Sequence, residues 1–123
     1  STLADRAHSH LEVARAEATL RSARAFYYQS IEEAWLAAEN GERVSIEQRR
    51  DIRLATTHAV EASIKTVNAM YTLGGGSVVY ADSPLQRHLR DVHVTSQHIM
   101  VAPSTLETVG RLYLGVDAQT STL

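Results

Sequence analysis

The sequence contains no cysteine, which excludes disulfide bonds, thiolate metal sites and cysteine nucleophiles. Only two of its 123 residues are proline and six are glycine, so few positions interrupt regular structure. No run approaches the roughly 18 consecutive apolar residues of a transmembrane helix, and the N-terminus lacks the basic and apolar regions of a signal peptide. We therefore expect a packed domain outside the membrane, with the cytoplasm as its default location.

The chain also lacks a strong charge of either sign. Its formal net charge is -2 at pH 7, from 12 basic and 14 acidic side chains. Because this balance creates no general attraction for nucleic acid, we expect no nucleic-acid partner. Hydrophobic residues make up 44% and charged residues 21%, which is typical of a folded globular domain. A chain of this length is expected to form one domain, residues 1–123.

Helical periodicity is what the sequence has in abundance. Apolar residues recur at steps of three and four, which predicts four helices, at about residues 5–40, 46–73, 84–101 and 104–114. Ser45 and Gln48 are the two ends of a capping box that starts the second of these helices. Gly41 and Gly115 supply helix stops, and the tail after residue 115 is expected to fray.

The first two helices indicate how they pack. In the first, one apolar stripe consists of Val13, Ala16, Leu20, Ala23, Tyr27, Ile31 and Ala34. In the second, the face typical of two helices at a shallow crossing angle consists of Ile52, Ala55, Ala59, Ala62, Thr66, Ala69 and Leu73. A polar strip on the second helix consists of Arg50, Thr57, Glu61, Lys65 and Asn68. Further apolar surface outside the stripes predicts that each helix has more than one neighbour.

These features predict an all-α fold, an antiparallel up-and-down helical bundle of the four-helix type. The predicted helices do not cover one another completely, and the chain begins at Ser1 without a methionine. We therefore expect a fragment that lacks the first helix of the bundle. Apolar surface that stays uncovered would be buried in an oligomer.

Three glycines follow the second predicted helix. Gly74, Gly75 and Gly76 come after a helix rather than a strand, and no lysine opens the next helix, so phosphate-loop and dinucleotide-binding motifs do not apply. One interpretation is a helix stop followed by a flexible crossing. The other is that the glycines let a second backbone or a planar ligand come close, because they carry no side chain.

The helix after the glycines collects cations. It begins with Pro84 at the first helical position, and Arg87 and Arg90 lie near this N-terminal end, where unpaired backbone amides favour a bound anion. The alternative is a surface ion pair between Arg87 and Asp91, worth about 0.5 kcal/mol or less.

Histidines are also concentrated in this region. His88, His93 and His98 are five positions apart, about 140° around a helix, so we expect no zinc site. The sequence also lacks the strand-turn-helix nucleophile segment of a Ser-His-Asp hydrolase. A single histidine remains a candidate for acid-base chemistry because imidazole titrates near neutral pH; a structural polar role is the alternative for His98.

Three segments together resemble a known family. They are residues 71–77 (YTLGGGS), 83–98 (SPLQRHLRDVHVTSQH) and 105–115 (TLETVGRLYLG). The chain resembles the C-terminal helical domain of the acyl-CoA dehydrogenase superfamily over nearly its whole length. It is more closely similar to the branch of flavin-dependent monooxygenases, which use reduced flavin and dioxygen.

The resemblance implies a bundle that completes a flavin site, for FAD or FMN, together with an N-terminal helical domain and a central β-barrel. It implies homo-oligomers, dimers or tetramers, formed through the bundles. It also implies that Gly74 and Gly75 admit the cofactor, and that Arg87 or Arg90 holds its phosphate end or the bundle interface. His98 would face the flavin ring, where it supports the oxygen chemistry or the deprotonation of an aromatic substrate.

One departure separates the branches of the superfamily. Many acyl-CoA dehydrogenases carry a glutamate base shortly after the Arg-Asp pair, but here no carboxylate lies between Asp91 and Glu107. We therefore expect a two-component aromatic hydroxylase, supplied with reduced flavin by a separate reductase, whose isolated C-terminal fragment is inactive. A true FAD-dependent acyl-CoA dehydrogenase with its base elsewhere, or a non-catalytic helical self-association module, are the alternatives. The substrate is not identified.

Overall fold

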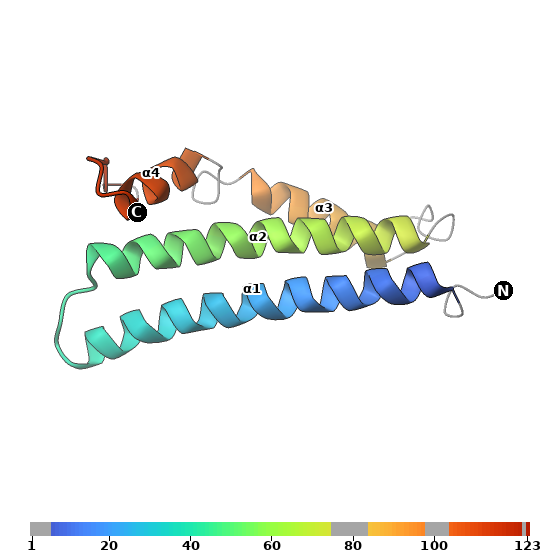
Figure 1. The fold of residues 1–123 in the computed structure, drawn as a ribbon, viewed down its shortest axis with the longest axis horizontal. Coiled ribbons are helices and arrows are strands. Elements are labelled where there is room, and N and C mark those ends of the chain that lie inside the picture. The colour runs from blue at the N-terminus through green and yellow to red at the C-terminus, as the bar shows by residue number, and fades with distance from the viewer. Residues whose placement is uncertain (1–5, 75–83, 98–103, 122) are drawn as a thin grey trace.

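The described part of the chain is helical in all its regular structure. The computed structural model describes residues 6–74, 84–97, 104–121 and 123. These residues form α1 (Ala7–Glu39), α2 (Ile46–Gly74), α3 (Pro84–Ser96) and α4 (Ser104–Tyr113), and contain no strand (Figure 1). The predicted all-α fold is confirmed. The predicted bounds are close to those observed, except that α3 ends at Ser96 rather than at residue 101.

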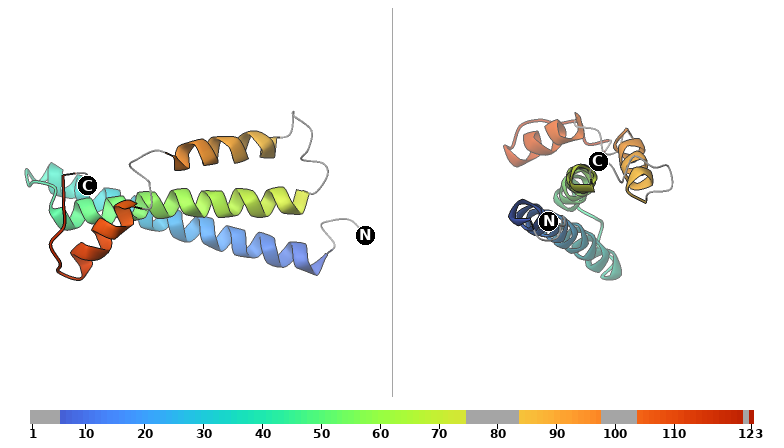
Figure 2. Two further views of the ribbon diagram at one scale, coloured as in Figure 1. Left: turned by 90° about the horizontal axis from the view of Figure 1, so that it is seen from above. Right: turned by 90° about the vertical axis from the view of Figure 1, so that its right-hand side faces the viewer.

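α2 is the central helix. It packs against α1 on one side and against α3 and α4 on the other (Figure 1). Figure 2 shows α3 beside the C-terminal half of α2 and α4 beside its N-terminal half. α1 and α3 both run antiparallel to α2, as the up-and-down prediction requires. The prediction of more than one neighbour is therefore confirmed for α2, whereas α1 packs mainly against α2 among the described helices.

Small side chains form the seam between α1 and α2. The buried residues of α1 are Ser9, Ala23, Ser30, Ala34 and Ala37. On α2 the predicted face is buried at Ala55, Ala62 and Thr66. Because none of these side chains is bulky, the two backbones can approach closely at these positions.

The predicted stripe on α1 is only partly correct. Ala23 and Ala34 are buried as expected, but Val13, Leu20 and Ile31 are exposed. A large side chain in the seam would hold the two helices apart, so the small residues take the contact with α2. The large residues of the stripe consequently lie on the flank of α1.

Local sequence signals determine the turn between α1 and α2. Gly41 has a φ of 76°, and the next amide, of Glu42, donates to the carbonyl of Ala37 at 2.9 Å. The capping box is present in both directions: the Ser45 amide donates to Gln48 Oε1 at 2.9 Å, and the Gln48 amide donates to Ser45 Oγ at 3.0 Å. Both predicted signals are confirmed.

α4 covers a residue of the polar strip that was predicted on the second helix. Thr57 of α2 is 0% exposed, and its Oγ1 lies 3.4 Å from Oγ1 of Thr105 on α4. Val109 of α4 is also buried. Thr57, a member of the polar strip predicted on the second helix, is therefore buried at a helix contact. The predicted stop at Gly115 is confirmed by its φ of 71°.

The C-terminal tail does not match the expectation of fraying, because two arginines hold its described residues. Arg49 Nη2 of α2 donates to the carbonyl oxygens of Thr120 and Leu123, each at 3.0 Å. Arg111 Nε of α4 donates to the carbonyl of Asp117 at 2.8 Å. The two arginine side chains thus satisfy backbone carbonyls of the tail and attach the tail to α2 and α4.

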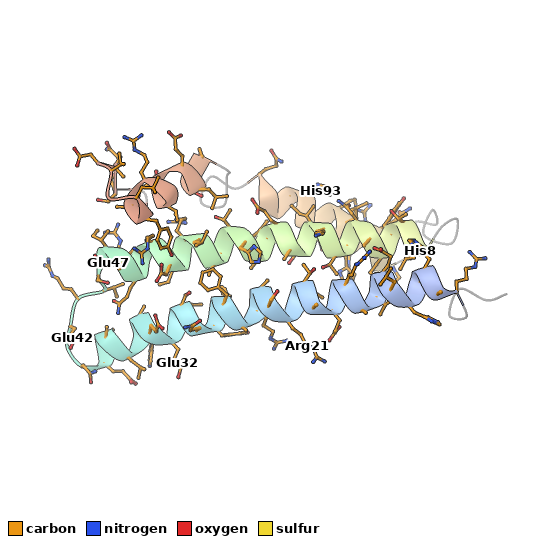
Figure 3. The ribbon with its side chains drawn as sticks, in the orientation of Figure 1. His8, Arg21, Glu32, Glu42, Glu47 and His93 are labelled. Carbon is orange, nitrogen blue, oxygen red and sulfur yellow. The ribbon has the colours of Figure 1, made fainter. Side chains whose placement is uncertain are left out.

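The side of α1 away from α2 is charged. Figure 3 shows Arg21 and Glu32 projecting there, and Arg21 Nε lies 2.8 Å from Glu17 Oε1. Such exposed ion pairs stabilise a helix by about 0.5 kcal/mol or less. Within the described residues, none of the helices has the length and apolar character needed to cross a membrane.

Candidate functional site

A groove of about 590 Å³ runs between α1 and α3, with α2 as its floor. The residues that line it are Leu20, Ala23, Arg24, Tyr27 and Tyr28 from α1, Thr56, Ala59, Val60 and Ser63 from α2, and Asp91 and Val92 from α3. Most of this lining is apolar. The charged members, Arg24 and Asp91, come from opposite walls, so the groove offers one charge of each sign beside an apolar floor.

Aromatic side chains form the α1 wall of the groove. Tyr27 and Tyr28 meet edge to face, with ring centroids 5.7 Å apart. The Arg24 guanidinium carbon lies 5.6 Å from the Tyr28 ring centroid, within the range of a cation-π contact. Tyr28 is nevertheless 59% exposed, and along the same helix Trp35 is 64% exposed. This flank of α1 therefore presents large apolar groups that α2 does not cover.

The hydroxyl groups on the groove floor are already used inside α2. Thr56 Oγ1 donates to the Ile52 carbonyl at 2.7 Å, and Ser63 Oγ donates to the Ala59 carbonyl at 2.8 Å. Their protons are thus directed along their own helix. The floor consequently presents mainly methyl and methylene surface, which suits an apolar occupant.

The predicted site residues are only partly within the described structure. Gly74 is the last residue of α2 and is half-buried. Arg87 and Arg90 are exposed on α3, whose first turn lies beside the C-terminal end of α2 in both ribbon views. Neither arginine lines the groove. Gly75 and His98 lie outside the described residues, so their roles stay predictions.

No metal site is present among the residues that the structure describes, which contain no cluster of three or more His, Asp or Glu side chains able to hold an ion. The five histidines that the structure describes lie at exposed positions: His8 and His10 on α1, His58 on α2, and His88 and His93 on α3.

A polar cluster between α2 and α4 was not anticipated from the sequence. Asp51 Oδ1 accepts a hydrogen bond from Tyr113 Oη at 2.7 Å and another from Arg50 Nε at 2.9 Å. The Arg50 guanidinium carbon also lies 4.0 Å from the Tyr113 ring centroid. The adjacent pair Arg50 and Asp51 does not by itself indicate this cluster, because its third member, Tyr113, is 62 positions away from Asp51.

The cluster shifts the proton affinity of all three members. Burial raises the pKa of Asp51, but the hydrogen bonds from Arg50 and Tyr113 outweigh it, and the net pKa is lowered from 3.8. Burial and then the hydrogen bond to Asp51 raise the pKa of Tyr113 from 10.0. The hydrogen bond to Asp51 raises the pKa of Arg50. At neutral pH the cluster therefore holds a charged Arg50, a charged Asp51 and a neutral Tyr113.

A second arginine of α2 is buried nearby. Arg53 is 8% exposed, and its pKa is lowered by burial and by the neighbouring positive charge of Arg49. Together with Arg49 and Arg50 it concentrates cations in the first turns of α2, on the part of the helix that α4 and the tail cover.

The family comparison agrees with this fold. The family described as acyl-CoA dehydrogenase, C-terminal domain, matches residues 1–103. The chain belongs to this family. Of the helices in this acyl-CoA dehydrogenase C-terminal domain, α1, α2 and α3 lie inside the matched region, whereas α4 follows it.

Curated relatives of the domain are named as monooxygenases or as a hydroxylase. It is 38% identical over 113 residues to an indole-3-acetate monooxygenase of Pseudomonas putida, covering 92% of this chain and 29% of that protein. It is 31% identical over 108 residues to a pigment production hydroxylase of Rhodococcus erythropolis, covering 87% of this chain and 28% of that protein. The chain thus spans less than a third of the relatives it matches.

Solved structures of a monooxygenase and a hydroxylase share the fold. The HsaA monooxygenase from M. tuberculosis superposes with a TM-score of 0.89 at 19% identity, covering 98% of this chain and 32% of that chain. The 3-HSA hydroxylase from Rhodococcus sp. RHA1 gives a TM-score of 0.90 at 20% identity, covering 97% and 32% of the two chains. The domain therefore has the same helical arrangement as part of these larger proteins.

Proposed function

We propose that this domain belongs to a flavin-dependent monooxygenase that hydroxylates an aromatic compound. The observation that carries the proposal is the 38% identity to an indole-3-acetate monooxygenase over 92% of the chain. The lack of a carboxylate between Asp91 and Glu107 supports it, because a dehydrogenase of this superfamily commonly has its base there. Reduced FMN or FAD comes from a separate reductase, and the reaction takes place in the cytoplasm.

The donor groups on α3 fit the anionic end of a flavin. FMN carries a phosphate and FAD a pyrophosphate, and the planar guanidinium group binds phosphate oxygens in pairs. Arg87 and Arg90 are exposed near the N-terminal end of α3, so their side chains are accessible to such a group. When bound, the flavin supplies the redox chemistry, and the protein orients it and excludes water. Gly74 and Gly75 admit it.

His98 is the candidate catalytic residue. Neutral imidazole donates one hydrogen bond and accepts another, so it suits a position near both the reacting oxygen and an acidic group of the substrate. In this role it holds or moves a proton during hydroxylation.

The groove between α1 and α3 is the seat of a further helix in the complete protein. Two observations support this: the walls offer apolar side chains such as Leu20 and Tyr28, and among the helices that the structure describes α1 packs mainly against α2. Together with α1, α2 and α3, such a helix forms a four-helix bundle. An N-terminal helical domain and a β-barrel precede this helix in the complete protein. Apolar surface that remains on α1, including Trp35, is then buried between copies of the protein in a dimer or tetramer.

Oxygen incorporation by the full-length protein tests the proposal. The protein is supplied with reduced FMN or FAD, ¹⁸O-labelled dioxygen and indole-3-acetate as the probe substrate, and products are identified by mass spectrometry. A hydroxylase transfers one labelled oxygen atom to the aromatic probe and releases the other as water, with two electrons from the flavin. Unlabelled probe, together with bleaching of oxidised flavin by an acyl-CoA, would instead favour the dehydrogenase. Oligomers without flavin binding would favour the self-association module.

A further inference from the structure

A second pocket, of about 490 Å³, lies in the seam between α1 and α2. Its lining comes from residues 12–19 of α1 and 65–69 of α2. These segments belong to the N-terminal half of α1 and the C-terminal half of α2, which run side by side (Figure 1). None of the lining residues also lines the groove between α1 and α3, so the two hollows are separate candidate sites.

Thr66 contributes a buried hydroxyl group to the lining of this pocket. The residue is 9% exposed, and its Oγ1 has no hydrogen-bond partner among the residues that the structure describes. Three other hydroxyl groups of α2, those of Thr56, Ser63 and Thr72, each donate to the carbonyl four residues earlier. A buried polar group without a partner is unfavourable, and a bound ligand is one way to satisfy it. The Thr66 hydroxyl is therefore a candidate ligand contact.

The charged side chains at the pocket favour an anion. Lys65 and Arg15 contribute two positive charges, and Glu12 contributes one negative charge. Arg15 Nη1 lies 3.3 Å from Glu12 Oε1, so the charges of these two residues largely offset each other. Lys65 is exposed and forms no ion pair with the described residues. Its ammonium group therefore gives the pocket a net positive charge.

The remaining lining favours an anion that has an apolar part. Ala16, Ala18 and Ala69 contribute no polar side-chain atoms to the pocket. An inorganic ion would leave these methyl groups uncovered, whereas a short hydrocarbon group would bury them. The volume of about 490 Å³ also exceeds what a single inorganic ion fills. The lining therefore matches a small organic acid better than a mineral ion.

We propose that the pocket between α1 and α2 binds a small organic carboxylate. The Thr66 hydroxyl donates to a carboxylate oxygen, and the Lys65 ammonium group pairs with the negative charge. The half-buried Thr19 on α1 supplies a further hydroxyl donor. The hydrocarbon part of the ligand lies against the alanine methyl groups. This binding involves no flavin chemistry, so it does not depend on the proposed function.

Titration of the full-length protein with para-fluorobenzoate, followed by fluorine NMR, tests the proposal. We expect saturable binding that Thr66→Val weakens about tenfold, because valine keeps the shape of threonine and lacks the hydroxyl. Lys65→Met should weaken the same binding about threefold or more. Thr72→Val changes an exposed threonine of the same helix and is the matched control, which should bind like the wild type.

Thermal unfolding without para-fluorobenzoate separates a ligand contact from a structural role. Because the Thr66 hydroxyl has no partner in the described fold, Thr66→Val should unfold at the wild-type temperature or above it. A lower melting temperature would show that the hydroxyl serves the fold, and it would overturn the proposal. Equal binding of para-fluorobenzoate by the wild type and Thr66→Val, or no saturable binding, would also overturn it.

Inorganic phosphate distinguishes an organic carboxylate from anions in general. In the same titration, phosphate should show no binding that Thr66→Val or Lys65→Met weakens, because it has no hydrocarbon part for the alanine surface. Phosphate binding that both variants weaken as strongly as they weaken binding of para-fluorobenzoate would overturn the assignment to a carboxylate. Oxygen incorporation by the full-length protein is measured separately, so either proposal can fail without the other.

Discussion

Thr57 of α2 and Thr105 of α4 face each other, with their Oγ1 atoms 3.4 Å apart, and Thr57 is 0% exposed. The packing of the two helices leaves no free volume at this contact. Thr57→Leu adds volume where none is free, so we expect it to lower the free energy of unfolding by about 1–3 kcal/mol. Urea unfolding followed by circular dichroism measures the effect. Thr72→Leu, at an exposed position of the same helix, should change stability by about 0.5 kcal/mol or less.

A second prediction concerns the effect of a larger side chain in the α1–α2 seam on stability. Ala23 is 3% exposed and packs where the two backbones approach closely. Ala23→Leu should force the helices apart and lower the melting temperature, by an amount equivalent to about 1–3 kcal/mol. Ala25→Leu places the same side chain on the exposed face of α1 and serves as the control. Equal melting temperatures for the two variants would show that the seam is not as tight as the structure indicates.

Two glycines with opposite backbone requirements give a third prediction. Gly41 has a φ of 76°, which a side chain disfavours, so Gly41→Ala should destabilise the protein by about 1 kcal/mol. Gly110 lies inside α4, and an added Cβ would meet nothing within 4 Å. Gly110→Ala should therefore stabilise the protein by up to about 1 kcal/mol. Thermal unfolding distinguishes the two signs, and a stabilising Gly41→Ala would contradict the left-handed turn.

The polar cluster predicts how stability depends on pH. The folded pKa of Asp51 lies below 3.8, so its contribution is present above that pH and is lost as the pH falls through the folded value. The folded pKa of Tyr113 lies above 10.0, so its contribution is present below pH 10 and is lost as the pH rises through the folded value. Melting temperatures across both ranges test this. Tyr113→Phe should show a weaker alkaline loss than the wild type.

His98 supplies the prediction for catalysis. His98→Ala in the full-length protein should divert reduced flavin to hydrogen peroxide or slow hydroxylation, by about 10²-fold or more if the imidazole transfers a proton. Product and peroxide are measured together under single-turnover conditions. His58→Ala, on an exposed position of α2, is the control. Unchanged coupled turnover in His98→Ala would remove the catalytic role.

Signals between residues that are close together in the chain predict the local structure correctly. Ser45 and Gln48 are three positions apart, and their reciprocal hydrogen bonds appear as predicted. The positive φ values of Gly41 and Gly115 likewise follow from their places after helical repeats. Such features depend on the backbone of one turn, so the local sequence contains both partners.

The sequence indicated which segment belongs to the candidate site, whereas the tertiary structure alone gave the arrangement of the groove. The segment from Gly74 to His98 is distinguished by its residue types and by its resemblance to a family, and that family is the one that matches residues 1–103. Nothing in the sequence predicted that Arg24 and Asp91 would stand on opposite walls of one groove. Those residues come from helices separated by more than half of the chain, and only their packing on α2 brings them together.

By itself the sequence determined where four helices lie, to within a few residues except at the end of α3, and that their apolar faces need partners. The tertiary structure decided which residues meet: that alanines rather than Leu20 take the α1–α2 contact, that Thr57 is covered, and that Tyr113 reaches Asp51. The physical reason is one of range. Helix formation is governed by bonds four residues apart, whereas the choice among several apolar or polar faces depends on the volume and charge of side chains that arrive from distant parts of the chain.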